Sequence, residues 1–331
     1  MNWSSQKVLV TGGGGFIASH LCEELVRQGA SLRALVRYNS RGTSGWLEDS
    51  PPQLRRSIEI LQGDLRDPDT VDRVVKSCRY VFHLGAIISI PYSYIAPTEV
   101  TQVNVGGTQN ILNACLRHGV QRLVHTSTSE VFGTAQYVPI DEAHPLQAQS
   151  PYAASKIAAD KLVESYWRSF DLPAVTIRPF NTYGPRQSAR AIIPTAVVQF
   201  FAKQSPKLDS LTPTRDFTYV SDTVAGMIAA MNAPQAIGHN VNLGTGREIA
   251  IRDLITLIAE MLGTRPLVDL DPSRVRPKNS EVDRLLADNT RARELLQWHP
   301  RISLEEGLRS TIAWLESHMD LYRRALEEYV V

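Results

Sequence analysis

The stretch that decides the fold reads Lys7-Val8-Leu9-Val10-Thr11-Gly12-Gly13-Gly14-Gly15-Phe16-Ile17-Ala18. Its first five residues are mostly apolar, which predicts a buried strand, and a helical pattern follows from residue 16 to residue 28. Glycines between the two let the backbone turn sharply and approach a phosphate, whose charge then faces the N-terminus of the helix. The stretch therefore predicts a dinucleotide-binding turn formed by Gly12, Gly15, Phe16 and Ile17, with Ala18 where a third glycine is common.

Outward from this turn, the first half of the chain alternates short apolar runs with longer helical patterns. We expect further strands at 32–36, 58–61, 80–84, 122–125 and 174–178, and helices at 69–78, 104–118 and 152–170. This alternation predicts an α/β fold, a Rossmann-type doubly wound parallel sheet with helices on both faces.

The sequence pattern changes after Pro179, where loops rich in proline, glycine and arginine separate shorter predicted elements. Helices are expected there at 192–203, 220–232, 251–262, 290–296 and 303–329. We expect an NAD(P)-binding domain with the catalytic residues over 1–179. A smaller α/β substrate-binding domain is expected over 180–331, some elements of which can cross back to the sheet.

Composition narrows the function classes. The chain has 331 residues, is 43% hydrophobic, and carries 35 Lys and Arg against 34 Asp and Glu, a formal net charge of +1. This balance argues against nucleic-acid binding by bulk electrostatics but leaves room for a local basic pocket. No apolar run is long enough for a membrane helix, and the first residues do not resemble a signal peptide. The three cysteines are far apart in the sequence, which predicts neither disulfides nor a zinc site, and a reducing cytoplasm is therefore the expected location. The histidines are not spaced like metal ligands, so no metal site is predicted.

The end of the second strand bears on the choice between two nicotinamide cofactors. A carboxylate there binds the ribose 2′-hydroxyl of NAD, but this chain has none between Arg37 and Glu48. Arg37, with Asn39 and Ser40 nearby, can hold a 2′-phosphate, which slightly favours NADP over NAD. The alternative is that Arg37 is only a surface residue.

Two further strand ends are candidates for cofactor contact. Asp64 and Leu65 follow the third strand, where an aspartate can accept a hydrogen bond from the adenine amine; a turn-forming aspartate is about equally plausible. Leu84 and Ala86 end the fourth strand, and small residues there would let a cofactor lie close to the sheet.

The candidate catalytic residues follow the fifth strand and open the next helix. Tyr152 and Lys156 are four residues apart and therefore share one helix face, where both are also expected to reach the cofactor. An ammonium near a phenol stabilises the phenolate, so Tyr152 can act as a base near neutral pH, and Thr128 can share its proton. Alone such a pair is more often accidental, but after a nucleotide turn it predicts a catalytic site.

These residues resemble the short-chain dehydrogenase/reductase superfamily, in its extended branch of nucleotide-sugar epimerases and dehydratases. The resemblance covers nearly the whole chain and rests on the glycine turn, the Tyr152/Lys156 pair, and the segments 83–86, 104–108, 178–181 and 215–220. It implies an enzyme with a tightly bound cofactor that is regenerated each cycle. It also implies a homodimer formed through the helices at 104–118 and 152–170.

Within that branch the chain is most similar to the 4,6-dehydratases of N-acetylated nucleotide sugars of the legionaminic-acid type. The segments that suggest this are 90–94, 127–140, 181–190 and 276–282. The implied substrate is a nucleotide-diphosphate sugar, UDP-N-acetylglucosamine or a related hexosamine nucleotide, and the implied product is the 4-keto-6-deoxy sugar. The resemblance also implies that the diphosphate is bound by Asn181, Arg215 and Arg276, and that Arg186 and Arg190 of the nearby loop also reach the ligand, although any one arginine there could instead form a surface ion pair.

The resemblance implies a mechanism. Tyr152 would take the proton of the sugar O4 while hydride leaves C4, and Glu130 would then take the C5 proton before water is lost and hydride returns to C6. Many 4,6-dehydratases have an aspartate acid where this chain has Ser129, so water or Glu130 would protonate the leaving hydroxyl. A 4-epimerase, a UDP-glucuronate decarboxylase and a non-catalytic NAD(P)-binding sensor or scaffold remain alternatives, and a structural role remains one for Glu130.

Overall fold

A seven-stranded parallel sheet forms the centre of the computed structural model, which describes residues 2–4, 6–274 and 277–322. The strand order is β11-β6-β5-β4-β1-β2-β3, and every neighbouring pair is parallel. The strands are β1 (Lys7–Thr11), β2 (Ser31–Arg37), β3 (Ile58–Gly63), β4 (Tyr80–His83), β5 (Arg122–Thr126), β6 (Ala174–Pro179) and β11 (Asn240–Leu243). The predicted Rossmann-type fold is confirmed.

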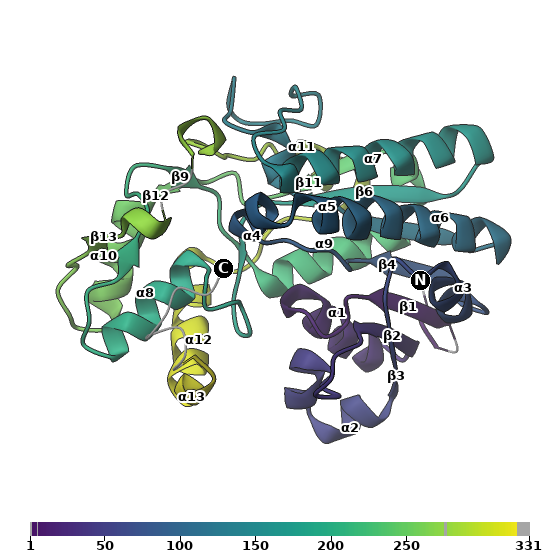
Figure 1. The fold of residues 1–331 in the computed structure, drawn as a ribbon, viewed down its shortest axis with the longest axis horizontal. Helices are drawn as coiled ribbons and strands as arrows, with labels where there is room; N and C mark the ends of the chain where they lie inside the picture. Colours follow the sequence, from purple (N-terminus) through teal and green to yellow (C-terminus); the bar gives the residue numbers. More distant parts are fainter. Residues whose placement is uncertain (1, 5, 275–276, 323–331) are drawn as a thin grey trace.

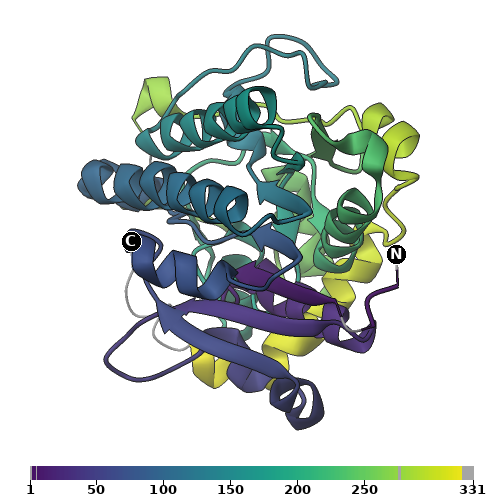
Figure 2. The ribbon, with the colours of Figure 1, turned by 90° about the vertical axis from the view of Figure 1, so that its right-hand side faces the viewer.

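Helices cover both faces of this sheet, as Figure 1 shows. One face packs against α1 (Phe16–Arg27), α9 (Val220–Asn232) and α11 (Thr290–Leu296). The other packs against α3 (Pro68–Val75), α6 (Gly107–Arg117) and α7 (Pro151–Phe170), and α6 and α7 lie side by side (Figure 1 and Figure 2). Because both faces are covered, successive residues of strands such as β1 and β4 are buried rather than alternating between buried and exposed.

A second lobe lies beside the carboxyl ends of the strands and has its own apolar core (Figure 1). Its helices are α8 (Ile192–Phe201), α10 (Ile251–Met261), α12 (Leu304–Ser317) and α13 (Met319–Tyr322). Three two-stranded sheets complete it: β7 (Thr182–Tyr183) with β10 (Thr218–Tyr219), β9 (Thr214–Arg215) with β12 (Ile249–Ala250), and β8 (Lys207–Leu208) with β13 (Asp269–Leu270).

Short elements connect these parts. They are the helices α2 (Pro52–Arg56), α4 (Ile90–Ile95) and α5 (Pro97–Thr101), a π-helical turn η2 (Gln102–Gly106), and the 3-10 turns η1 (Gly45–Asp49), η3 (Ser129–Phe132), η4 (Pro234–Ala236), η5 (Pro272–Arg274) and η6 (Lys278–Ser280). The expected helix at 104–118 is thus preceded without a break by α5, and its first residues form the wider π turn. Such turns are rare and often lie at functional sites.

The chain does not divide cleanly at residue 179. After the first lobe it enters the second, returns with α9 and β11 to the sheet, leaves again with α10, and comes back with α11. The loop segments that leave the strands therefore lie between the two lobes, where a ligand can contact both.

The expected long helix at 303–329 is interrupted at His318, whose backbone angles, φ −125° and ψ 23°, are not helical. Its ring lies 2.8 Å from the carbonyl oxygen of Trp314, and the Ser317 hydroxyl donates to the same oxygen at 2.9 Å. These side chains compete with the helical hydrogen bonds, which favours an end there. The helix resumes as α13 up to Tyr322, and residues 323–329 lie outside the described residues.

Two features are missing from the part of the chain that the structure describes. No described helix is both long and apolar enough to span a membrane. The described histidine, cysteine and carboxylate side chains form no group of three or more that is arranged to hold a metal ion.

Candidate active site

The glycine turn between β1 and α1 brings its backbone close to the neighbouring strand end and leaves no room for a side chain at Gly12. Gly12 has φ +72°, and a Cβ placed on it would lie 2.9 Å from the Gly85 Cα atom, so a side chain does not fit. Gly15 precedes α1, whose first turn has no acidic residue and no side-chain cap, so its N–H groups can face an anion. These residues fit the pyrophosphate of a dinucleotide.

The end of β4 is fixed against this turn by Thr11. The Thr11 hydroxyl oxygen accepts hydrogen bonds from the backbone N–H groups of Leu84 at 3.1 Å and Gly85 at 3.0 Å. It also lies 2.8 Å from the His83 Nδ1 atom. The first and fourth strand ends therefore form one surface along which a cofactor can lie.

A cavity of about 140 Å³ adjoins this surface. Five of the predicted cofactor residues line it, namely Gly12, Arg37, Asp64, Leu65 and Ala86. Hydrogen bonds from Arg66 hold the pKa of the Asp64 carboxyl below its usual range, so this group accepts hydrogen bonds at neutral pH. The cavity is the right kind of space for the adenosine half of the cofactor.

The predicted cofactor residues at the end of β2, Arg37, Asn39 and Ser40, have different surroundings. The Arg37 side chain is 72% exposed, and its Nη2 atom lies 3.5 Å from a carboxylate oxygen of Glu99. The Asn39 side chain bonds to the backbone of Arg41 and of Thr43, so it shapes its own loop. Ser40 is exposed. Of the three, Arg37 is the one that also lines the cavity.

The predicted catalytic pair, Tyr152 and Lys156, is positioned by the first turns of α7. This helix begins with a serine cap, since the Ser150 hydroxyl accepts the N–H of Ala153 at 3.0 Å, and Pro151 occupies its first position. Tyr152 and Lys156 point into the protein and are 6% and 4% exposed. The Lys156 ammonium donates to the carbonyl oxygen of Thr126, the last residue of β5, at 2.6 Å.

The end of β5 supplies the groups around the phenol. Thr128 begins the short turn η3, and its hydroxyl accepts the N–H of Glu130 at 3.2 Å. Burial raises the pKa of Tyr152 above its ordinary value, the hydrogen bond with Thr128 opposes this, and the charge of Glu130 adds to it. Tyr152, Thr128 and Glu130 thus form one interacting group.

Burial also determines the charge of the lysine, lowering the pKa of Lys156 to about 8. From the sequence we predicted that Lys156 lowers the pKa of Tyr152. In the structure the largest effect on the phenol is burial, which has the opposite sign, so the phenol is protonated at neutral pH. Loss of its proton therefore requires a group that enters with the ligands.

A second cavity, of about 390 Å³, opens between the two lobes. The predicted residues Glu130, Asn181, Arg190 and Arg215 line it. Ser129, the predicted neighbour of Glu130, is 3% exposed and is not among the described residues that line this cavity. Sequence reasoning missed several charged lining residues, which are Lys207, Asp209, Arg274 and Glu281.

The predicted substrate arginines have different surroundings. Arg215 is nearly buried at the cavity wall, and its Nη2 atom lies 3.5 Å from Glu281 Oε1. Arg190 is exposed and bonds to the hydroxyl of Ser188 at 3.4 Å. Arg276 lies outside the described residues.

Arg186 faces away from the cavity that we expected it to line. It is buried, and its guanidinium donates to Glu23 Oε1 at 2.7 Å and to the Ser19 hydroxyl at 3.3 Å. Both partners belong to α1. The structure thus gives Arg186 a different role from the predicted one, because its ion pair fixes the 184–190 loop to the helix that follows the glycine turn.

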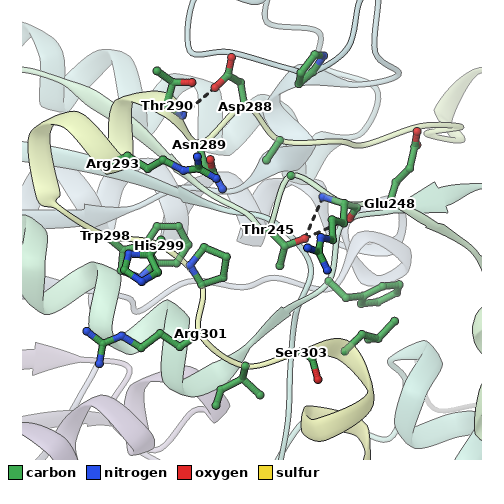
Figure 3. Close-up of a pocket in the computed structure, with 18 of the residues that line it drawn as sticks. Thr245, Glu248, Asp288, Asn289, Thr290, Arg293, Trp298, His299, Arg301 and Ser303 are labelled. Carbon is green, nitrogen blue, oxygen red and sulfur yellow. Dashed lines mark hydrogen bonds between the residues drawn. The ribbon is translucent and has the colours of Figure 1, made fainter.

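A cavity of about 1210 Å³, larger than the two above, is formed among the described residues by the loops after β11 and before α12 (Figure 3). Thr245 and Glu248 lie on one side of it and Asn289, Arg293 and His299 on the other (Figure 3). None of its described lining residues belongs to the predicted catalytic or cofactor set. Cavity volume alone therefore does not identify the site where the predicted catalytic residues lie.

The family model of the GDP-mannose 4,6 dehydratases matches residues 9–311 of this chain. The chain belongs to this family. That match spans the glycine turn, the Tyr152/Lys156 pair and most of the second lobe. The predicted membership of the extended nucleotide-sugar dehydratase and epimerase group is confirmed, and so is the prediction of an enzyme. The narrower legionaminic-type assignment remains a prediction.

Individual relatives carry out both kinds of reaction. A UDP-glucose 4-epimerase of Mycolicibacterium smegmatis is 33% identical over 94% of this chain and 99% of its own length. A dTDP-glucose 4,6-dehydratase of Streptomyces antibioticus is 32% identical over 93% of this chain and 91% of its own. A solved structure of a dTDP-glucose 4,6-dehydratase from Streptomyces venezuelae, with NAD bound, has a TM-score of 0.84 and 26% identity over 96% of this chain and 99% of that one.

Proposed function

We propose that the protein is an NAD(P)-dependent 4,6-dehydratase of a nucleotide-diphosphate hexosamine, UDP-N-acetylglucosamine or a close relative. The observation that carries this proposal is the place of Glu130. It lines the cavity between the lobes and acts electrostatically on the phenol of Tyr152, which supports a role for this carboxylate at the C5 and C6 atoms of a sugar bound at Tyr152. Oxidation at C4 needs only the tyrosine, whereas elimination also needs such a carboxylate.

The side chains of this protein supply the proton transfers. A bound nicotinamide ring supplies the hydride chemistry and brings a positive charge close to the phenol. Tyr152 removes the proton of the sugar O4, with the Thr128 hydroxyl sharing its hydrogen bond. The Lys156 ammonium, fixed on the Thr126 carbonyl, stabilises the phenolate that forms.

Glu130 carries the elimination. Once C4 is a ketone, the C5 proton is acidic, and Glu130 removes it. A serine hydroxyl such as that of Ser129 is a poor acid, so the same Glu130 carboxyl passes the proton to the leaving C6 hydroxyl. One residue then does the work that two acids share in many relatives.

The second lobe holds the nucleotide diphosphate. Asn181 and Arg215 line the cavity, and arginine suits bidentate contacts to phosphate. Arg190 lies at the open rim. The cofactor lies along the glycine turn, with adenosine beside Asp64, and Arg37 at the end of β2 favours a 2′-phosphate and hence NADP over NAD.

The main alternative is a 4-epimerase, which the similarity to UDP-glucose 4-epimerases supports. A UDP-glucuronate decarboxylase is the third possibility. All three begin with oxidation at C4 and differ in the later steps, so the product distinguishes them. The position of Glu130 in the sugar cavity favours the dehydratase.

The test is incubation of the purified protein with UDP-N-acetylglucosamine and added NAD or NADP, followed by mass spectrometry and NMR. Loss of one water with no net cofactor reduction is the expected result. An unchanged mass with inversion at C4 identifies an epimerase, and loss of carbon dioxide from UDP-glucuronate identifies the decarboxylase. Either result contradicts the dehydratase.

We also propose a cytoplasmic homodimer that pairs through α6 and α7, whose adjacent outer faces lie on one side of the sheet (Figure 2). The three buried, unpaired cysteines suit a reducing compartment. Light scattering after size exclusion tests the dimer, and a monomer at micromolar concentration contradicts it.

A further inference from the structure

A buried group of charged side chains lies behind the catalytic lysine and has no part in the proton transfers assigned to Tyr152 and Glu130. Asp160 follows Lys156 by four residues on α7, so the two lie on the same face of the helix. Both are at most 4% exposed. Burying an ammonium and a carboxylate is costly unless each has partners of opposite charge.

Asp160 is held by side chains from β6, from β5 and from the residue that follows β5. Arg178 on β6 donates to its Oδ2 atom from Nη2 at 3.0 Å and from Nε at 3.2 Å, and the Ser127 hydroxyl donates to the same oxygen at 2.8 Å. The other oxygen, Oδ1, lies 3.3 Å from His125 Nε2. Arg178 in turn stacks over Phe132, 5.1 Å from the ring centre.

The neighbours of the Lys156 ammonium leave Asp160 as its source of negative charge. Burial lowers the pKa of both His125 and His83, so these imidazoles are neutral. Tyr152 is a neutral phenol at neutral pH, and Arg178 is positive. Glu130 acts on the phenol from the cavity side. Asp160 raises the pKa of Lys156 against the effect of burial.

We propose that Asp160 is a positioning residue that supplies the counter-charge of the buried Lys156 ammonium, and that Arg178 holds its carboxylate in place. Only the catalytic consequence rests on the proposed function. Lys156 must be charged to stabilise the phenolate of Tyr152, so the Asp160–Arg178 pair sets the highest pH at which the enzyme works. The two partners act on Lys156 with opposite sign, which separates this role from that of a purely structural ion pair.

The test measures the titration of Lys156 directly, by NMR of the full chain with ¹³C-labelled lysine ε-carbons. The resonance is assigned as the one that Lys156→Arg removes. In Asp160→Asn we expect the titration midpoint to fall by ~1 pH unit or more from its native value of about 8. In Arg178→Gln it stays or rises, because Asp160 is then unopposed. An unchanged midpoint in Asp160→Asn, or a fall in both variants, overturns the proposal.

Two further variants keep the result interpretable. If Asp160→Asn does not fold, the double variant Asp160→Asn/Arg178→Gln removes both buried charges. The titration midpoint of Lys156 in this double variant is expected to lie below the native one. A native midpoint overturns the proposal. Glu23→Gln breaks the other buried pair, with Arg186, at 2.7 Å. It should lower the melting temperature without moving the Lys156 midpoint, and a shift there would show that general loosening explains the result.

Turnover gives the second readout. With the nucleotide sugar that the protein converts, the alkaline limb of kcat in each variant should follow the Lys156 midpoint from NMR. A limb that does not move with the midpoint overturns the catalytic consequence. A native protein that converts no nucleotide sugar contradicts the proposed function instead, and the titration still decides the counter-charge.

Discussion

The group of charged side chains around Lys156 and the group around the cavity between the two lobes are held in different ways. Around Lys156, the side chains come from one helix and from the ends of neighbouring strands, and each is buried. Around the cavity, Arg215 comes from a two-residue strand and is paired with Glu281, whereas Arg190 comes from a loop and is exposed. The buried side chains hold one another in place, whereas the exposed Arg190 guanidinium is accessible to a ligand.

This difference in burial predicts different consequences for substitutions in the two regions. Buried charges need several partners, so removing one is expected to affect catalysis and stability together. Exposed donors have water as an alternative, so removing one is expected to weaken ligand binding and leave the fold unchanged. Substitutions in the two regions test this contrast, from the largest expected effect to the smallest.

The largest effect is expected for Tyr152→Phe. It removes the hydroxyl that takes the O4 proton, so kcat should fall by about 10³-fold or more. Binding of the nicotinamide cofactor, measured by titration calorimetry, should change little, because the ring that packs in the site is retained. Turnover at the native rate would show that another group is the base.

Glu130→Gln tests the second carboxyl function. We expect a fall of about 10²-fold in water loss, since the amide can neither take the C5 proton nor donate it. Oxidation at C4 should continue, so single-turnover absorbance should show reduced nicotinamide accumulating. Glu260→Gln, an exposed glutamate on α10, is the matched control and should behave as native. Equal loss of both steps would contradict separate roles.

The pH profile tests the charge of the lysine. The pKa of Lys156 is lowered to about 8, so its proton is lost as pH rises through that value, and kcat should fall about tenfold per pH unit above it. Lys156→Arg keeps a positive charge at all these pH values, so whatever activity remains should lack this alkaline limb. A native profile that is flat to about pH 9.5 would contradict an essential ammonium.

A pair of arginine variants contrasts the loops directly. Arg190→Gln should raise the KM for the nucleotide sugar by about tenfold and leave the melting temperature nearly unchanged, because it removes an exposed charged donor at the cavity rim. Arg186→Gln should instead cost about 3 kcal/mol of unfolding free energy, because it leaves Glu23 without its buried partner. The reverse pattern would show that Arg186 contacts the ligand.

The smallest effect is expected for Arg37→Ala. The side chain is 72% exposed and its contact with Glu99 is long, so the protein should fold as before. Affinity for NADP should fall several-fold while that for NAD stays within about twofold, as measured by fluorescence quenching. An equal change for both cofactors would mean that Arg37 does not contact a 2′-phosphate.

Local spacing allowed a large part of this protein to be predicted. The strand, glycine turn and helix at 7–28 follow from residues that are neighbours in sequence, and so does the Tyr152/Lys156 pair, because four residues on a helix return to one face. The same rule would also have pointed to Asp160, four residues further on, had its burial been known.

Tertiary structure alone decided the rest. Whether an arginine can bind a ligand or instead pairs with a carboxylate depends on which distant segment packs against it. Arg186 pairs with Glu23 on α1, whereas Arg215 lines the cavity between the lobes. Burial likewise reversed the expected effect on the Tyr152 pKa, because desolvation depends on everything that surrounds a group. The sequence alone determined the order of the elements and the spacing of Tyr152 and Lys156. The packing of separate segments determined which side chains are buried and which partners the arginines have.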